Sequence, residues 1–168
     1  ESTFHQGVST PPFPLLNGGI CEHRVMCKLI SEAEQCIHME NQICVSAGTT
    51  LNQIFTVVGE RVVTSYKTHD AFYFIFITNL YQMDEARVID YIIKNQLYWS
   101  LNHLYDYVLK RGVPFDFIQQ RIFIGFLRHK DTPIKIHSNI LIKDGHECIR
   151  SSSNLSDRSL SVFKCDNE

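Results

Sequence analysis

One run of residues near the C-terminus decides how this chain is interpreted: Ile134-Lys135-Ile136-His137-Ser138-Asn139-Ile140-Leu141-Ile142-Lys143-Asp144. Apolar side chains alternate along most of it, which is typical of a β-strand whose side chains point in turn to its two faces. One face would carry Ile134, Ile136, Ser138, Ile140 and Ile142, and the other Lys135, His137, Asn139, Leu141 and Lys143. The pattern therefore predicts a strand over 134–143, in which His137 and Asn139 lie side by side and can contact one ligand.

The flanking sequence predicts an α/β fold. Asp144-Gly145 favours a hairpin turn into a short strand, His146–Ile149. Strand-like runs cover Cys36–Val45, Ala71–Thr78 and Arg121–Leu127, and Ala71–Thr78 is apolar enough to predict burial on both faces. Helical periodicity covers Glu22–Glu34, Thr50–Tyr66 with Thr50 as N-cap, and Asp84–Lys110. Strands separated by helices indicate a mixed, partly parallel β-sheet flanked by helices.

The chain of 168 residues fits a single domain. Residues 1–21 are rich in Pro and Gly and are predicted to form an extended N-terminal segment, residues 22–162 the folded domain, and residues 163–168 a tail. The absence of an initial Met favours a processed product or a fragment.

Composition excludes several classes of protein. Apolar residues make up 44% and charged residues 20% of the chain, as in soluble globular proteins. The net charge of -2 lacks the basic footprint of a nucleic-acid-binding protein. No apolar run is long enough to cross a bilayer, and no signal peptide is recognised. The six cysteines have no metal-ligand spacing and favour a reduced, cytoplasmic setting over a disulfide framework.

A second informative segment follows the first: Ser151-Ser152-Ser153-Asn154-Leu155-Ser156-Asp157-Arg158-Ser159. Together the two segments resemble the phospholipase D superfamily, whose motif H-x-K-x-x-x-x-D is followed by a G-S-x-N turn and, in the eukaryotic enzymes, by N-I-N-D-R-S. Here His137 and Asp144 stand at the required spacing, with Asn139 in place of the lysine and Ser151 in place of the glycine. Upstream, the run Ile37-His38-Met39-Glu40-Asn41-Gln42 is similar to the I-Y-I-E-N-Q strand of those enzymes. The resemblance covers roughly 22–162 and implies one half of a phospholipase D-type catalytic domain.

The resemblance also implies roles for individual residues. His137 would be the general acid that protonates the leaving alcohol, while a histidine from the other half attacks phosphorus and forms a phosphohistidine. Asp144 would support the site. Phosphate binding would fall to Asn139, Ser152 and Asn154, and the supporting residues would be Glu40, Asn41, Gln42, Asp157 and Arg158. No metal and no cofactor are expected.

Two substitutions predict weak or absent activity. Asn139 offers a neutral amide where the family has an ammonium group, and Ser151 adds a Cβ where glycine can adopt a positive φ or approach a ligand closely. Lys135 and Lys143, on the predicted face of His137, are candidates to replace part of the missing charge.

Three functions therefore stay open. The first is half of an enzyme that hydrolyses phosphatidylcholine to phosphatidate and choline, inactive alone and completed by a first-half domain. The second is a pseudoenzyme that binds lipid headgroups or proteins. The third is a short nuclease or phosphodiesterase that forms a homodimer and so pairs two His137 residues. A phospholipid and peripheral membrane contact are the expected partners, and nucleic acid is not favoured.

Overall fold

The computed structural model describes residues 3–5, 22–46, 52–79, 87–130 and 132–160. Its helices are α1 (Glu22–Glu32), α2 (Ile54–Thr68), α3 (Arg87–Leu109), α4 (Phe115–Arg121) and α5 (Asp157–Leu160). Its strands are β1 (Thr3–His5), β2 (Cys36–Glu40), β3 (Tyr73–Thr78), β4 (Ile122–Phe126), β5 (Arg128–His129), β6 (Thr132–Pro133), β7 (Asn139–Lys143) and β8 (Glu147–Ser151). The predicted N-cap Thr50, Cys21, Cys165 and the tail 163–168 lie outside the described residues.

Six strands form one mixed sheet in the order β1-β8-β7-β2-β3-β4, and β5 pairs only with β6. Strands β2, β3 and β4 run parallel, whereas β7 is antiparallel to both β2 and β8. These pairings confirm the predicted α/β fold with a mixed sheet, and they confirm the hairpin through Asp144-Gly145.

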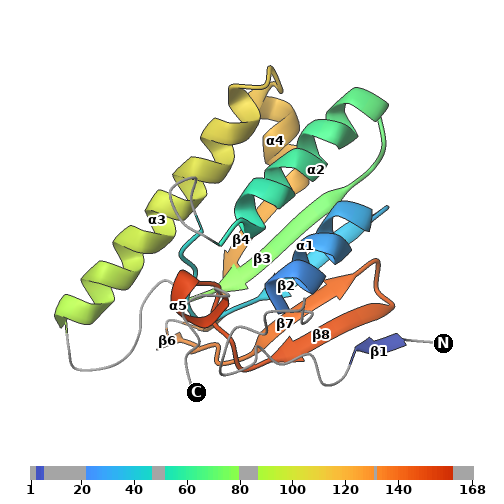
Figure 1. Cartoon of the computed structure of the whole chain (residues 1–168). Coiled ribbons are helices and arrows are strands. Elements are labelled where there is room, and N and C mark those ends of the chain that lie inside the picture. The colour runs from blue at the N-terminus through green and yellow to red at the C-terminus, as the bar shows by residue number, and fades with distance from the viewer. Residues whose placement is uncertain (1–2, 6–21, 47–51, 80–86, 131, 161–168) are drawn as a thin grey trace.

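Helices α1, α2 and α3 cover one face of this sheet (Figure 1). The core lies between them, where the ring of Phe55 on α2 meets the rings of Phe74 and Phe76 edge-on at 6.0 and 5.5 Å. The opposite face is less covered: Tyr73 on β3 is 38% exposed and Phe123 on β4 is 48% exposed. The prediction that Ala71–Thr78 is buried on both faces is therefore wrong, because side chains of β3 alternate between the core and this second face.

Several predicted boundaries are also wrong. Strand β2 ends at Glu40 rather than Val45, because the side chain of Asn41 accepts the backbone N–H groups of Ile43 and Leu155, each at 3.1 Å. The predicted strand over 134–143 is regular only from Asn139 onward. Helix α4 was not predicted, since its seven residues include only one buried side chain, Ile118, and so show no helical apolar period.

None of the helices within the described residues combines the length and the hydropathy that a bilayer-spanning helix requires.

Candidate functional site

The two motif segments meet at one edge of the sheet. Strand β7 begins at Asn139 and β8 ends at Ser151, and these two residues are directly opposite each other in the antiparallel ladder. His137 precedes this pair and Ser152 follows it, so both leave the sheet at the same end. Glu40, at the carboxyl end of β2, pairs with Ile140 next to Asn139. The structure thus brings the His137 segment, the 151–154 turn and the Glu40-Asn41-Gln42 run together.

Asn41 ties the end of β2 to the turn. Its side chain is buried and donates from Nδ2 to the carbonyl oxygen of Ser153 at 3.3 Å, besides accepting the two N–H groups that end the strand. Its own carbonyl oxygen accepts a hydrogen bond from the Thr78 hydroxyl at 2.8 Å. Every polar atom of the Asn41 side chain is therefore used in holding the backbone, which makes it a positioning residue for the turn.

Asn79, which follows β3, fixes the segment that leads to His137. Its Oδ1 accepts the N–H of Ile136 at 2.7 Å and its Nδ2 donates to the Ile136 carbonyl at 2.8 Å. This two-bond clamp replaces the ladder bonds that a continuous strand over 134–138 would have made. Asn79 was not among the candidate residues, although parallel strands bring their carboxyl ends to one edge, where polar residues gather.

Asn139 and His137 differ in burial. Asn139 is 6% exposed, and its Oδ1 accepts the N–H of Gln42 at 3.4 Å. His137 is exposed, and no hydrogen bond links its ring to another described residue. The predicted placement of the two side chains on one strand face is therefore wrong, because the chain before Asn139 has left the sheet.

Glu40 lies on the sheet face opposite the helices. Its carboxylate accepts a hydrogen bond from the Ser138 hydroxyl at 2.5 Å and contacts Nε2 of His38 at 3.3 Å. Ser138 is the residue between His137 and Asn139. Glu40 therefore restrains the backbone on which His137 is mounted, from the side opposite Asn139.

The turn itself is held by serine hydroxyls. The N–H of Ser153 donates to Oγ of Ser151 at 2.9 Å, and Ser152 is exposed between them. The Asn154 side chain is partly buried, and its Oδ1 accepts no hydrogen bond from a described residue. Ser151 has no positive φ, so the serine at the glycine position causes no backbone strain. Its hydroxyl instead becomes part of the turn.

Glu22, the first residue of α1, lies under this turn and was not foreseen from the sequence. It is 2% exposed, and its Oε2 accepts a hydrogen bond from the Ser153 hydroxyl at 2.8 Å. Burial raises the pKa of the Glu22 carboxyl group, although hydrogen bonds from Ser151 and Ser153 act in the opposite direction. Its Oε1 is buried and accepts no hydrogen bond from a described residue. An acidic residue at a helix start usually predicts a solvated charge, so no pattern in the sequence distinguished it.

Replacing Glu22 by glutamine is expected to stabilise the protein at pH 7 by about 1 kcal/mol, the size of one hydrogen bond, because the amide avoids the cost of burying a carboxylate or of protonating it above its ordinary pKa. Because the pKa of Glu22 is raised in the folded protein, Glu22 contributes fully to the stability of the wild-type protein only below the ordinary glutamate pKa of about 4.3. This contribution is lost as the pH rises through the pKa of the folded state. The gain should therefore shrink towards pH 4. Urea unfolding at both pH values measures it, with the exposed Glu32→Gln on the same helix as control. A variant less stable than wild type at pH 7 would contradict this account.

Asp144 lies at the other end of β7. Its carboxylate accepts the backbone N–H groups of Glu34, Gln35 and Cys36 at 3.0, 2.7 and 2.8 Å, and so joins the β7–β8 turn to the segment between α1 and β2. A strand of this length separates Asp144 from Asn139 by roughly 17 Å. The structure therefore does not bring the expected catalytic Asp144 to the His137 end, and its contacts are those of a structural residue.

The Asp144→Asn variant is expected to lose about 2 kcal/mol of stability at pH 7, because an amide cannot accept all three N–H groups. Burial would raise the pKa of Asp144, but the three backbone hydrogen bonds outweigh it and the pKa is lowered. The stabilisation is thus present above the ordinary value of about 3.9 and is lost as pH falls through the folded value. Asparagine tolerates the φ of 50° at this position, so backbone strain does not contribute. Urea unfolding against pH tests this, with the exposed Asp106→Asn as control; equal losses in both variants would refute it.

The remaining candidate residues are the two lysines Lys143 and Lys135 and the Asp157-Arg158 pair. Lys143 pairs with Glu147 at 2.6 Å beside Asp144, so it does not supply charge to the His137 end. Lys135 is exposed, two residues before His137. The side chains of Asp157 and Arg158 lie outside the described residues, and only their backbone, in α5, is placed.

No group of three or more His, Cys, Asp or Glu side chains in the described part of the chain is arranged to hold a metal ion.

Comparison with known proteins points to a relationship with phospholipase D. No protein-family model matches the chain. Phospholipase D zeta 2 of Arabidopsis thaliana is 24% identical over an alignment of length 167, and the match covers 82% of this chain and 15% of that protein. The chain thus spans only a small part of the length of this relative. Its sequence is therefore similar to a part of a phospholipase D.

Proposed function

We propose that this chain is one half of a phospholipase D-type phosphodiesterase that cleaves phosphatidylcholine to phosphatidate and choline once a first half is supplied. The observation that supports it is the pairing of Asn139 with Ser151. This pairing gathers the His137 segment and the serine-rich turn beside Glu40-Asn41-Gln42, which is the order of motifs in that family. The similarity to a phospholipase D points the same way.

The site residues have distinct tasks in this reaction. The exposed His137 donates a proton to the leaving alcohol as the bond from phosphorus to its oxygen breaks. The new bond at phosphorus is to a histidine of the other half, and water activated by His137 later displaces that histidine. The hydroxyl of Ser152 and the Nδ2 group of Asn154 hold phosphoryl oxygens, whose charge grows in the transition state.

The chain alone lacks two parts of this machinery. It supplies one imidazole where the reaction needs two, and it has a neutral amide in place of the motif lysine. The amide oxygen of Asn139 is already engaged with the N–H of Gln42. The hydrogen bond between Asn139 and Gln42 favours a second candidate function, in which the domain binds a lipid headgroup but does not hydrolyse it. Peripheral membrane contact from the cytoplasm and pairing with a first half or a second copy stay predictions.

The proposal is tested by giving the isolated chain phosphocholine and a water-soluble phosphodiester. Ring signals of His137 should shift in NMR spectra on addition of phosphocholine, whereas those of His146, near the opposite end of β7, should not. Hydrolysis of bis(4-nitrophenyl) phosphate should be absent at every protein concentration. A rate that rises faster than linearly with concentration and disappears in His137→Ala would instead establish the homodimeric enzyme, and unmoved His137 signals would refute the site.

A further inference from the structure

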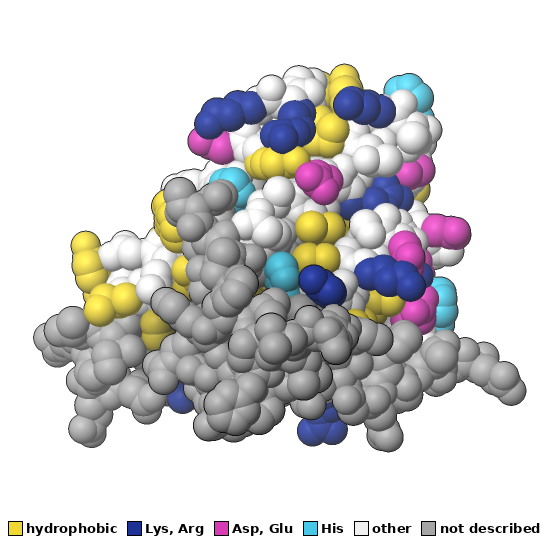
Figure 2. Space-filling model, in the orientation of Figure 1, with side chains coloured by type: hydrophobic (Ala, Val, Ile, Leu, Met, Phe, Trp, Pro, Cys, Tyr) yellow, Lys and Arg dark blue, Asp and Glu magenta, His cyan; other side chains and the backbone are white. Residues whose placement is uncertain are grey.

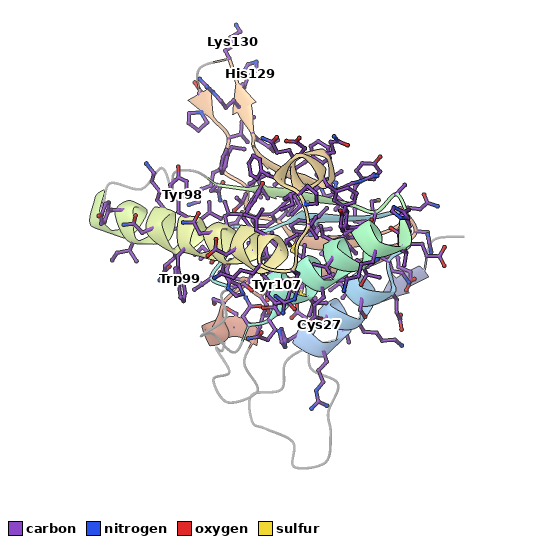
Figure 3. The ribbon with its side chains drawn as sticks, turned by 90° about the horizontal axis from the view of Figure 1, so that it is seen from above. Cys27, Tyr98, Trp99, Tyr107, His129 and Lys130 are labelled. Atoms are coloured by element: carbon purple, nitrogen blue, oxygen red, sulfur yellow. The ribbon has the colours of Figure 1, made fainter. Side chains whose placement is uncertain are left out.

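The segment between β4 and His137 forms a small hairpin that stands out from the domain. Strands β5 and β6 pair through Arg128 with Pro133 and His129 with Thr132. Figure 3 shows the hairpin projecting away from α1 and α2, with His129 and Lys130 at its tip. Within the described residues it pairs with no other strand.

The base of this hairpin is apolar and exposed. Phe126, Leu127 and Ile134 are 38%, 44% and 45% exposed, and they adjoin where the N–H of Ile134 donates to the carbonyl oxygen of Leu127 at 2.9 Å. Exposing three large apolar side chains on one short hairpin to water is unfavourable in free energy, and a membrane or another protein that covered them would remove this penalty.

Positive charge surrounds these apolar side chains. Residues 126–135 carry Arg128, Lys130 and Lys135 against a single acid, Asp131, in a chain whose net charge is -2. Arg128, Lys130 and Lys135 are all exposed. On the helix-covered side of the domain, by contrast, Figure 2 shows acidic and basic side chains interspersed. Lys130 also occupies a φ of 54°, a conformation that glycine or asparagine adopts at less cost.

We propose that this hairpin is a membrane anchor that docks the domain on an anionic phospholipid surface. Exposed apolar side chains insert among acyl chains, and adjacent cations meet negatively charged headgroups. Charge complementarity selects this occupant over a neutral apolar protein surface. The proposal rests on the proposed function only in that a phospholipid is the expected substrate.

Docking in this way would place the candidate site at the interface. His137 follows Ile134 by three residues, so the two lie within about 10 Å even if the chain is extended. The clamp from Asn79 to Ile136 holds this connection to the end of β3. A bilayer held by the hairpin is therefore held next to the exposed imidazole.

The experiment is co-sedimentation of the whole chain with vesicles of phosphatidylcholine, with and without phosphatidylserine. Binding should require phosphatidylserine and weaken in high salt. The variant Arg128→Gln/Lys130→Gln should bind about 30-fold more weakly, from the usual contribution of two surface cations. The control Lys67→Gln/Lys110→Gln removes two exposed lysines near the far ends of α2 and α3 and should bind as wild type. Absence of binding to phosphatidylserine vesicles, or an equal loss in both double variants, would overturn the proposal.

Fluorescence separates insertion from nonspecific attraction. Trp99 on α3 is the single tryptophan of the chain, and both Trp99 and its chain neighbour Tyr98 are exposed (Figure 3). Wild-type emission should not change on vesicles, whereas emission of Leu127→Trp in a Trp99→Phe background should shift to the blue. A shift of Trp99 without one at residue 127 would assign membrane contact to α3 and reject the hairpin. Because neither readout requires turnover, failure here leaves the proposed phosphodiesterase untouched.

Discussion

Asn139→Lys is expected to raise choline release about 10²–10³-fold over the unmodified chain when each is mixed with a first-half domain that carries its own motif, since that is the usual effect of one transition-state donor. A lysine at 139 would start opposite Ser151, in the turn whose Ser153 hydroxyl donates to Glu22. The buried Glu22 carboxylate could therefore hold the new ammonium group away from the phosphate. The substitution is best made in a Glu22→Gln background, where an amide replaces that carboxylate.

The matched control for this gain is Asn139→Met, which adds similar length without charge. A methionine variant that released as much choline as the lysine variant would show that packing, not charge, limits turnover. Ser151→Gly, by contrast, is expected to lower activity in any background, because it removes the oxygen that accepts the N–H of Ser153.

Arg61→Met is expected to reduce the free energy of unfolding by about 3 kcal/mol, which is large beside a typical total of 5–15 kcal/mol. Arg61 is 8% exposed and donates to the carbonyl oxygens of Ala33 and Glu34 at 2.6 and 3.2 Å, just beyond the end of α1. It also pairs with Asp70 at 3.1 Å and stacks over the ring of Phe72 at 4.5 Å. Methionine keeps the packing but removes the donor of the two carbonyl oxygens, whereas Asp70 keeps its hydrogen bonds from Thr68 and Phe72.

Urea unfolding measures this loss. Lys67→Met, an exposed change on the same helix, should alter stability by less than about 0.5 kcal/mol. A loss below about 1 kcal/mol for Arg61→Met would show that water replaces the guanidinium group easily. The connection between α1 and α2 would then depend on apolar contacts alone.

The sequence predicted the architecture well because apolar periodicity follows burial. Helices α1, α2 and α3 and the core strands all carry strong patterns, and the Asp144-Gly145 turn has the chemistry of a hairpin. The errors lie where side chains compete with backbone pairing. Asn41 ends β2 and Asn79 holds Ile136 out of the sheet, and neither contact is visible in a one-dimensional pattern.

The site was predicted less completely, for a related reason. Motif spacing located the segments that meet at the Asn139–Ser151 pair, but it did not show which residues face the same ligand. The strand rise alone places Asp144 far from Asn139, so that separation could have been inferred. Glu22 could not have been, because more than a hundred residues separate it from the serine it contacts.

The central claim is that His137 is the one imidazole that this chain contributes to a site completed by a first half. The most direct measurement is choline release from phosphatidylcholine vesicles by the Asn139→Lys chain mixed with such a domain. The account predicts no release by either component alone, release by the mixture, loss to background in His137→Ala, and full activity in the control His146→Ala. Undiminished release by the His137→Ala mixture would contradict it.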